Sequence, residues 1–402
     1  MLKHRTLIAG LTAAWLGAGA FSAEPPLPRF RSVDVDTHVE IGYGVAVADV
    51  DGDGRPDILL VDKSQIVWYQ NPSWQKHVIV EKLTESDNVC IAAQDINGDG
   101  KAEIAVGAGW NPSDTVNSGA VFYLIPPADR TQRWEPVVLP HEPTVHRMRW
   151  VRNQSGKFDL VVVPLHGRGN KAGVGAGARA LAYHIPADPK QPWTTEVIED
   201  FMHLSHNFQP VHWTDREADD LLIAGKEGVF HMVHHPEGWK RAQLVGNAPG
   251  ETNFVGAGEV RVGKLAAEQP FVATIEPMHG TQLAIYTIPS SGTATGLWKR
   301  TLLDDSLVDG HALGCADFIG IGRDQIVAGW RAMGKADTKV GIRIYTPLDA
   351  SGKTWRTTLL DDNSMACEDL CLADLNGDGK MDIVASGRAT HNLKIYFNEA
   401  GR

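Results

Sequence analysis

A nine-residue acidic motif occurs three times and constrains the fold more than any other feature of the sequence. It reads DVDGDGRPD at residues 49–57, DINGDGKAE at residues 95–103 and DLNGDGKMD at residues 374–382. Short apolar runs flank each copy, such as VAVA before and ILLV after the first. Runs of this length, bounded by Asp and Gly, are typical of β-strands and not of helices. We therefore expect each motif to be a loop that joins two strands.

The motif places oxygen-bearing side chains at its first, third, fifth and ninth positions, and its glycines allow a tight turn. Calcium takes six to eight oxygen ligands, so this spacing predicts a calcium-binding loop. A solvated acidic turn would explain one copy, but three copies in one register favour a cation. About three structural calcium sites are expected, with the ligands Asp49, Asp51, Asp53, Asp57, Asp95, Asn97, Asp99, Glu103, Asp374, Asn376, Asp378 and Asp382.

A second repeated feature is an aromatic strand that ends near a proline and is followed by a tryptophan that begins another strand. VWYQNPSW is the first example, and IRIYTP leading to Trp355 is a later one. Between the first and last acidic motifs the repeat measures about 54 residues, within the range of propeller blades. The tryptophans that recur once per unit are expected to pack structurally, namely Trp74, Trp134, Trp193, Trp239, Trp298 and Trp355.

These spacings predict an all-β fold, a seven-bladed β-propeller that forms a single domain over residues 24–402. The seventh unit has only three strands, while residues 30–35, before the first unit, have the alternation of an unpartnered strand. We expect this N-terminal strand to complete the last blade and close the ring, because closure removes exposed sheet edges.

The N-terminus and the net charge limit where the protein acts and what it binds. Basic Lys3 and Arg5 precede an apolar run at residues 7–21, which is typical of a signal peptide at residues 1–23, cleaved after residue 20 or residue 23. No later apolar run is long enough to cross a membrane. The formal charge of −11 argues against a nucleic-acid partner. We therefore expect a secreted or periplasmic protein.

Strand direction alternates within a blade, so each loop can be assigned to one of two faces. The acidic loops lie on one face, while the starts of the first strands meet the ends of the second strands on the other. Imidazole, carboxylate, guanidinium and indole groups gather at this second face. They come from the first strands at Asp87, Asn88, His146, Arg147, His206, Asn207, His311, Glu368 and Asp369, and from the second at Trp110, His166, Lys226, Glu276, His279, Trp330, Arg331 and Arg388.

Histidine and carboxylate side chains can act as general base and acid or can hold a metal ion, and tryptophan faces suit sugar rings. A lone histidine at a strand end is more often structural, but the convergence of several favours a functional role. Trp110 and Trp330 lie outside the once-per-blade register and are ligand candidates. Glu259 could point into the central channel or lie buried against Arg261, and the sequence leaves this open.

The repeated DxDGDGxxD loops resemble those of the FG-GAP/VCBS-repeat propellers, which bind calcium. A narrower resemblance rests on the segments HRMRW, SHNFQP, GAGEVRVG, TIEPMHG and DGHALGCADF. Together they are similar to the propeller domain of the aldos-2-ulose dehydratases (1,5-anhydrofructose dehydratases) and their bacterial relatives. That family eliminates water from keto-sugars such as 1,5-anhydrofructose. The resemblance concerns the propeller alone, because the cupin domains of the fungal enzymes have no counterpart in these 402 residues.

The resemblance implies a lyase in which His146 is the base. His206, Glu276, His279 and His311 would bind an additional divalent metal or the substrate hydroxyls. The residues expected to bind the small-molecule or oligosaccharide ligand are Trp110, Arg147, His166, Lys226, Trp330, Arg331 and Arg388. The alternative is a non-catalytic, calcium-dependent propeller that binds a glycan or a protein.

Overall fold

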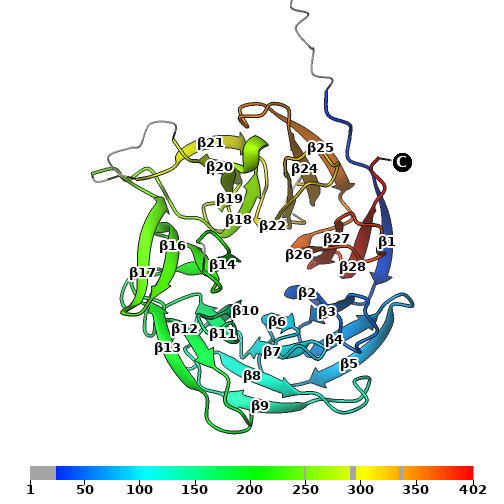
Figure 1. Cartoon of the computed structure of the whole chain (residues 1–402), viewed down its shortest axis with the longest axis vertical. Helices are drawn as coiled ribbons and strands as arrows, with labels where there is room; N and C mark the ends of the chain where they lie inside the picture. Colours follow the sequence, from blue (N-terminus) through cyan, green and yellow to red (C-terminus); the bar gives the residue numbers. More distant parts are fainter. Residues whose placement is uncertain (1–23, 215, 249, 290–295, 335–337, 402) are drawn as a thin grey trace, which may run out of the picture.

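The computed structural model describes residues 24–214, 216–248, 250–289, 296–334 and 338–401. The signal peptide expected at residues 1–23 lies outside them. Seven four-stranded antiparallel sheets are arranged around a central axis (Figure 1). The fold is therefore an all-β, seven-bladed propeller, as the repeat spacing predicted.

The blades follow one another along the chain, and each runs from an inner first strand to an outer fourth strand. Blade 1 has β2 (Gly44–Ala48), β3 (Asp57–Val61), β4 (Gln65–Gln70) and β5 (Gln75–Glu81). Blade 2 has β6 (Cys90–Gln94), β7 (Glu103–Ala108), β8 (Ala120–Ile125) and β9 (Glu135–Leu139). Blade 3 has β10 (Val145–Arg152), β11 (Phe158–Pro164), β12 (Ala180–His184) and β13 (Thr194–Glu199). Blade 4 has β14 (Ser205–Val211), β15 (Asp220–Gly225), β16 (Gly228–His235) and β17 (Gly238–Val245).

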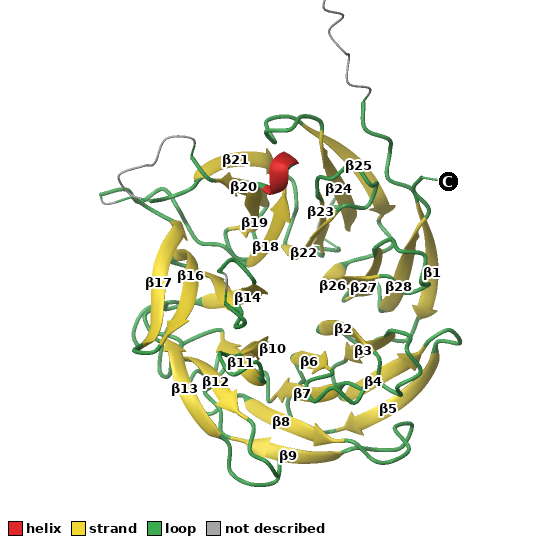
Figure 2. Ribbon diagram, in the orientation of Figure 1, coloured by secondary structure: helices red, strands yellow, loops and turns green. Residues whose placement is uncertain are grey.

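Blade 5 has β18 (Glu259–Lys264), β19 (Pro270–Glu276), β20 (Gln282–Thr287) and β21 (Lys299–Asp304). Blade 6 has β22 (Gly310–Ala316), β23 (Gln325–Trp330), β24 (Gly341–Pro347) and β25 (Trp355–Asp362). Blade 7 has β26 (Cys367–Ala373), β27 (Asp382–Gly387), β28 (Asn392–Asn398) and β1 (Phe30–Asp36). Within the described ranges the one helix is the short 3-10 turn η1 (Ala266–Glu268), drawn red in Figure 2. No helix of this part is long and apolar enough to span a bilayer.

Burial differs systematically between the strands of a blade. The second strands, such as β3, β7 and β27, are buried along their whole length, which explains their near-continuous apolar sequences. The fourth strands, such as β9 and β13, expose much of their length to solvent. The apolar core accordingly forms clusters that extend from blade to blade around the ring.

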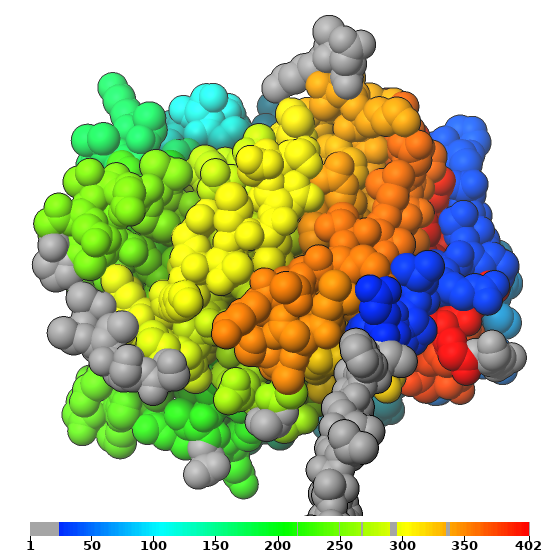
Figure 3. Space-filling view, turned by 90° about the horizontal axis from the view of Figure 1, so that it is seen from above, coloured from blue at the N-terminus to red at the C-terminus, as the bar shows by residue number. Residues whose placement is uncertain are grey.

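Blade 7 combines three strands from the C-terminal end of the chain with one from the N-terminal end. β1 pairs antiparallel with β28, with Phe30 opposite Asn398. The Phe30 ring packs edge-on against Phe318 of blade 6, at 5.6 Å between centroids. In Figure 3 the blue N-terminal segment lies against the orange and red C-terminal segments. Residues from both ends of the chain therefore share one sheet.

Candidate functional site

Four first strands contain a β-bulge at the same place, near the face opposite the acidic loops. In each strand one residue is skipped by the pairing with the second strand, and these residues are His146, His206, His311 and Glu368. A bulged residue has no partner across the ladder, so its side chain can be turned away from the usual alternation. The bulges thereby aim three imidazoles and one carboxylate at the same end of the propeller.

Each of these imidazoles is oriented by a backbone carbonyl of the following blade. Nδ1 of His146 lies 2.8 Å from the carbonyl oxygen of His206, and Nδ1 of His206 lies 2.8 Å from that of Gly258. Nδ1 of His311 makes the same bond to the carbonyl of Glu368. Because a carbonyl oxygen only accepts hydrogen bonds, Nδ1 carries the proton in each ring. Nε2 of the neutral imidazole is therefore left with a free lone pair.

Three histidines form a compact group that could hold a metal ion. Nitrogen atoms of His206, His279 and His311 lie within 4.8 Å of one another, and the Nε2 atoms of His206 and His279 are 2.9 Å apart. His206 Nε2 is an acceptor, so His279 either donates a proton to it or shares a cation with it. Ring nitrogens whose opposite N–H groups donate to carbonyls are typical of metal-ligating histidines. The donor set therefore fits a divalent transition metal such as zinc.

The four imidazoles are held neutral by their surroundings. Burial is the main reason that the pKa values of His146, His206 and His311 lie well below the usual histidine value. Burial, and then the charge of Arg331, lowers the pKa of His279 to about 4. A neutral imidazole is the form that binds a metal or accepts a proton.

His146 lies next to the three-histidine group and beneath an aromatic residue. Its ring centroid is 4.5 Å from that of His206 and 5.1 Å from that of Trp110, which follows β7. The side chain is buried, yet its Nε2 makes no hydrogen bond to any described residue. A base with a fixed ring and an unused lone pair is therefore available beside an indole face.

Two predicted arginines form a charged network at the edge of this group. Glu368 binds Nη1 of Arg331 at 2.6 Å and Nη1 of Arg388 at 3.1 Å. Arg331 also reaches Asp309 at 3.2 Å, and the Arg388 guanidinium lies 5.3 Å from the centre of the Tyr43 ring. His166 and Lys226 lie beside Leu204, the residue just before β14. His166 forms an isolated β-bridge with Leu204, and the backbone amide of Lys226 donates a hydrogen bond to the Leu204 carbonyl.

Two predicted site residues do not join the histidine group. Glu276 is buried in its own blade, where one oxygen accepts a hydrogen bond from Tyr286 and the other binds Arg300 at 2.8 Å. Trp330 is only 4% exposed and its indole packs under the Arg343 guanidinium at 4.6 Å. Trp330 therefore belongs to the core of blade 6, although it lies outside the tryptophan register.

Arg147 also differs from its predicted place, because it is buried and lines the central channel together with residues that do not include the four histidines. Glu259, which could have faced the channel or Arg261, does both: one oxygen is 3.8 Å from Arg147 and the other 3.5 Å from Arg261. Asn207 donates to the same carboxylate at 2.6 Å. This charged layer underlies the histidine group.

The three acidic loops share one internal geometry. The first aspartate of each loop accepts hydrogen bonds from the amides of both glycines, at distances between 2.7 and 2.9 Å. In the first loop, carboxylate oxygens of Asp49, Asp51 and Asp57 lie within 4.8 Å of one another. Burial, together with these two neighbouring charges, raises the pKa of Asp57 to about 7. Crowded oxygens on a preformed loop fit a calcium ion.

Comparison with known families adds a resemblance that covers part of the chain. Residues 118–289 match the family described as aldos-2-ulose dehydratase, beta-propeller domain. Residues 49–106 match an FG-GAP-like repeat, and residues 91–124 match the FG-GAP repeat. The chain resembles both groups. The dehydratase match includes His146, His206 and His279, whereas His311 lies beyond it.

Solved structures support the fold. An extracellular domain from B. thetaiotaomicron is 11% identical with a TM-score of 0.52, and the alignment covers 91% of this chain and 39% of that one. A chain of the mitotic checkpoint complex is 12% identical with a TM-score of 0.54, covering 98% and 99%. Rhamnogalacturonan lyase YesW is 14% identical with a TM-score of 0.51, covering 92% and 76%. No curated protein matches the sequence.

Proposed function

We propose that this protein is a carbon–oxygen lyase that acts on a keto-sugar or keto-glycoside at the histidine face, with His146 as the general base. The observation that carries the proposal is the His146 ring, which is fixed through Nδ1, neutral, and free at Nε2 beside three further histidines. The match of residues 118–289 to the dehydratase propeller family supports the same reaction class.

In this reaction His146 Nε2 removes the proton from the carbon next to the ketone, which the carbonyl group acidifies. The C–H electrons form a C=C bond while the bond from the β-carbon to its oxygen breaks, and the leaving oxygen takes up a proton that His146 can return. A positioned base of this kind contributes about 10²–10⁴-fold to a rate.

The remaining residues of the face bind and orient the sugar. A divalent metal held by His206, His279 and His311 would polarise the ketone and stabilise the enolate. Trp110 offers an indole surface beside His146, and Arg331 and Arg388 offer donors to hydroxyl groups. The calcium ions proposed for the acidic loops lie on the opposite face and are structural. With its expected signal peptide, the enzyme would act outside the cytoplasm.

The base can be tested with 1,5-anhydrofructose, because elimination produces an enone that absorbs in the ultraviolet. We expect His146→Ala to lower the rate of enone formation at least a hundredfold while the melting temperature stays within a few degrees. His141→Ala is the matched control, since His141 is exposed and bonds only to its neighbour's carbonyl. Full activity in His146→Ala would remove this residue from the role. Wild-type protein that binds keto-sugars without turnover would instead favour a binding propeller.

The metal can be tested separately by elemental analysis of the purified protein. We expect zinc, manganese or magnesium in addition to calcium, and loss of that second metal in His206→Ala and His311→Ala. If wild-type protein grown and purified with these metals contained calcium alone, the proposed metal site at the three histidines would be contradicted. The proposed role of His146 as base would not be affected by that result.

A further inference from the structure

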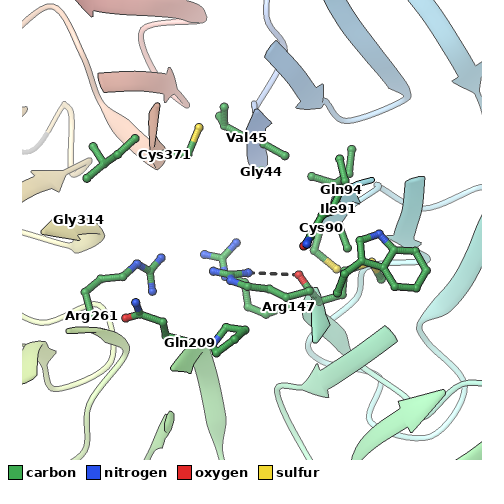
Figure 4. Close-up of a pocket in the computed structure, with 18 of the residues that line it drawn as sticks. Gly44, Val45, Cys90, Ile91, Gln94, Arg147, Gln209, Arg261, Gly314 and Cys371 are labelled. Atoms are coloured by element: carbon green, nitrogen blue, oxygen red, sulfur yellow. Dashed lines mark hydrogen bonds between the residues drawn. The ribbon is translucent and has the colours of Figure 1, made fainter. Parts of the chain in front are cut away.

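A cavity of about 790 Å³ runs along the propeller axis below the histidine group. All seven first strands line it, from Arg147 and Asp369 at its inner end to Arg152 and Asp219 at the face of the acidic loops. None of the four histidines is among its described lining residues. Figure 4 shows Arg147 and Arg261 extending into this space. The cavity is thus a second concave site that the proposed lyase reaction does not use.

One equivalent position in each blade forms a ring around the cavity. In five blades this position lies opposite the third residue of the second strand. In blades 3 and 5, whose second strands begin one residue earlier, it lies opposite the fourth. In blades 3, 4 and 5 it carries long polar side chains, and in the other four blades small ones. The seven residues, called the inner ring below, are Ala46, Ala92, Arg149, Gln209, Arg261, Gly314 and Cys371. Two guanidinium groups and an amide therefore face open space on one side of the ring.

Arg147 lies one step above the inner ring and has donors without acceptors. It is 4% exposed, and its Nε and Nη2 atoms are buried with no hydrogen-bond partner among the described residues. Its nearest carboxylate oxygen, on Glu259, is 3.8 Å away, beyond hydrogen-bond distance. Buried charged donors are costly to leave unsatisfied, so an acceptor within the cavity would stabilise this residue.

Of the two inner-ring arginines, Arg149 has no carboxylate partner among the described residues, whereas Arg261 has one. Arg149 donates to the carbonyl of Met148 and to the side chain of Asn207, and no carboxylate of a described residue lies within 4 Å of it. Burial, followed by the charges of Arg261 and Arg147, lowers the pKa of Arg149 to about 10. Arg261 reaches Glu259 at 3.5 Å.

The two carboxylates beside these arginines also contact other groups, although the Oε1 atom of Glu259 makes no hydrogen bond to a described residue. The Glu259 carboxylate lies near the guanidinium groups of Arg147 and Arg261 and accepts a hydrogen bond from Asn207. The Asp369 carboxylate accepts a hydrogen bond from the backbone amide of Val45 at 3.0 Å. At the inner end of the cavity, buried Arg147 and the half-buried Arg149 and Arg261 therefore lie near two carboxylates, Glu259 and Asp369, while Arg152, Glu217 and Asp219 line the cavity farther toward the acidic loops. Guanidinium groups bind planar or tetrahedral oxyanions in pairs of hydrogen bonds.

We propose that the cavity binds an oxyanion, the carboxylate, phosphate or sulfate group of a ligand, between Arg149, Gln209 and Arg261 and below Arg147. The ligand enters from the face of the acidic loops, because the exposed lining residues lie at that end. The site is independent of the proposed lyase reaction, since the layer of Arg147, Asn207 and Glu259 separates the cavity from the histidines.

The test is a calorimetric titration of the calcium-loaded chain with sodium sulfate and, separately, with sodium acetate, at constant ionic strength set with chloride. We expect saturable binding of at least one anion per chain. Sulfate alone would indicate a tetrahedral group and acetate alone a carboxylate. Arg149→Gln and Arg261→Gln should each raise the dissociation constant about tenfold or more, because each removes a charge-assisted donor.

Gln209→Glu distinguishes loss of anion binding from loss of the fold. The glutamate keeps the shape and the bond from the Val262 amide, at 2.8 Å in the wild type, but it adds a negative charge to the ring. It should abolish binding in a folded protein. Arg168→Gln, which removes an exposed arginine, is the control and should bind as the wild type does. Absence of saturable binding of both anions, or equal binding by all variants, would overturn the proposal.

Discussion

Buried carboxyl groups in this propeller differ in what compensates their charge. Glu276 faces the Arg300 guanidinium, whereas Glu199, at the end of β13, meets only the backbone amides of Phe201 and Met202. The second oxygen of Glu199 is buried without a partner among the described residues. Burial raises the pKa of Glu199 to about 8. At neutral pH the folded protein therefore holds this carboxyl protonated, at a cost to stability.

This cost predicts that Glu199→Gln stabilises the protein. The unfolded pKa is about 4.3, so between pH 4 and 8 the folded state binds a proton that the unfolded state releases, and stability falls as pH rises. Glutamine mimics the protonated acid and removes that loss. We expect a gain of about 1–3 kcal/mol at pH 8 and little gain at pH 4, measured by thermal melts across this range. Equal gains at both pH values would contradict the explanation.

At the scale of single elements, the acidic loops predict a response to metal removal. Without a cation the carboxylates of Asp49, Asp51 and Asp57 repel one another, since their oxygens lie within 4.8 Å. A ligand that binds only the folded state adds about 2.7 kcal/mol at a hundredfold excess over its dissociation constant. Chelator should therefore lower the melting temperature by several degrees, and added calcium should restore it. A melt that chelator leaves unchanged would contradict bound calcium.

Elements also show where sequence reasoning reached its limit. Seven blades could be predicted because the acidic and tryptophan motifs repeat, and the histidine face followed from strand direction. The bulges that aim His146, His206 and His311 have no signature in a single sequence, because they depend on pairing with the second strand. The same is true of the inner ring, where Arg149 and Arg261 become equivalent only after the strands are aligned.

Trp330 is a residue that the sequence analysis selected as a ligand candidate but that the structure places in the core. Its departure from the once-per-blade register suggested a ligand contact, but it packs in the core of blade 6 and donates to the Lys339 carbonyl at 2.6 Å. Register identifies repeated structural residues, but an unrepeated residue can still be structural. Burial decides between the two, and burial depends on neighbours that the sequence does not show.

At the scale of the whole molecule, the pairing of β1 with β28 predicts how the protein responds to truncation. Without β1, the apolar residues of β28 would form an exposed edge, and such edges recruit other chains. Deleting residues 24–36 would also remove the hydrogen bonds that Tyr69 and Lys76 donate to the Asp36 carboxylate, at 2.6 and 2.9 Å. We expect lower solubility and a broadened melt. A truncated chain as soluble and stable as the parent would contradict a structural role for this strand.

The same pairing sets the order in which the protein can finish folding. During synthesis β1 is made first among the strands, yet its partner β28 is made last, with more than three hundred residues between Val33 and Ile395. Contacts so distant in sequence form slowly. Until then β1 stays unpaired, and its charged residues Arg31, Asp34 and Asp36 make it a poor template for neighbouring chains. We therefore expect the charges on this strand to limit its pairing with other chains in the interval before the ring can close.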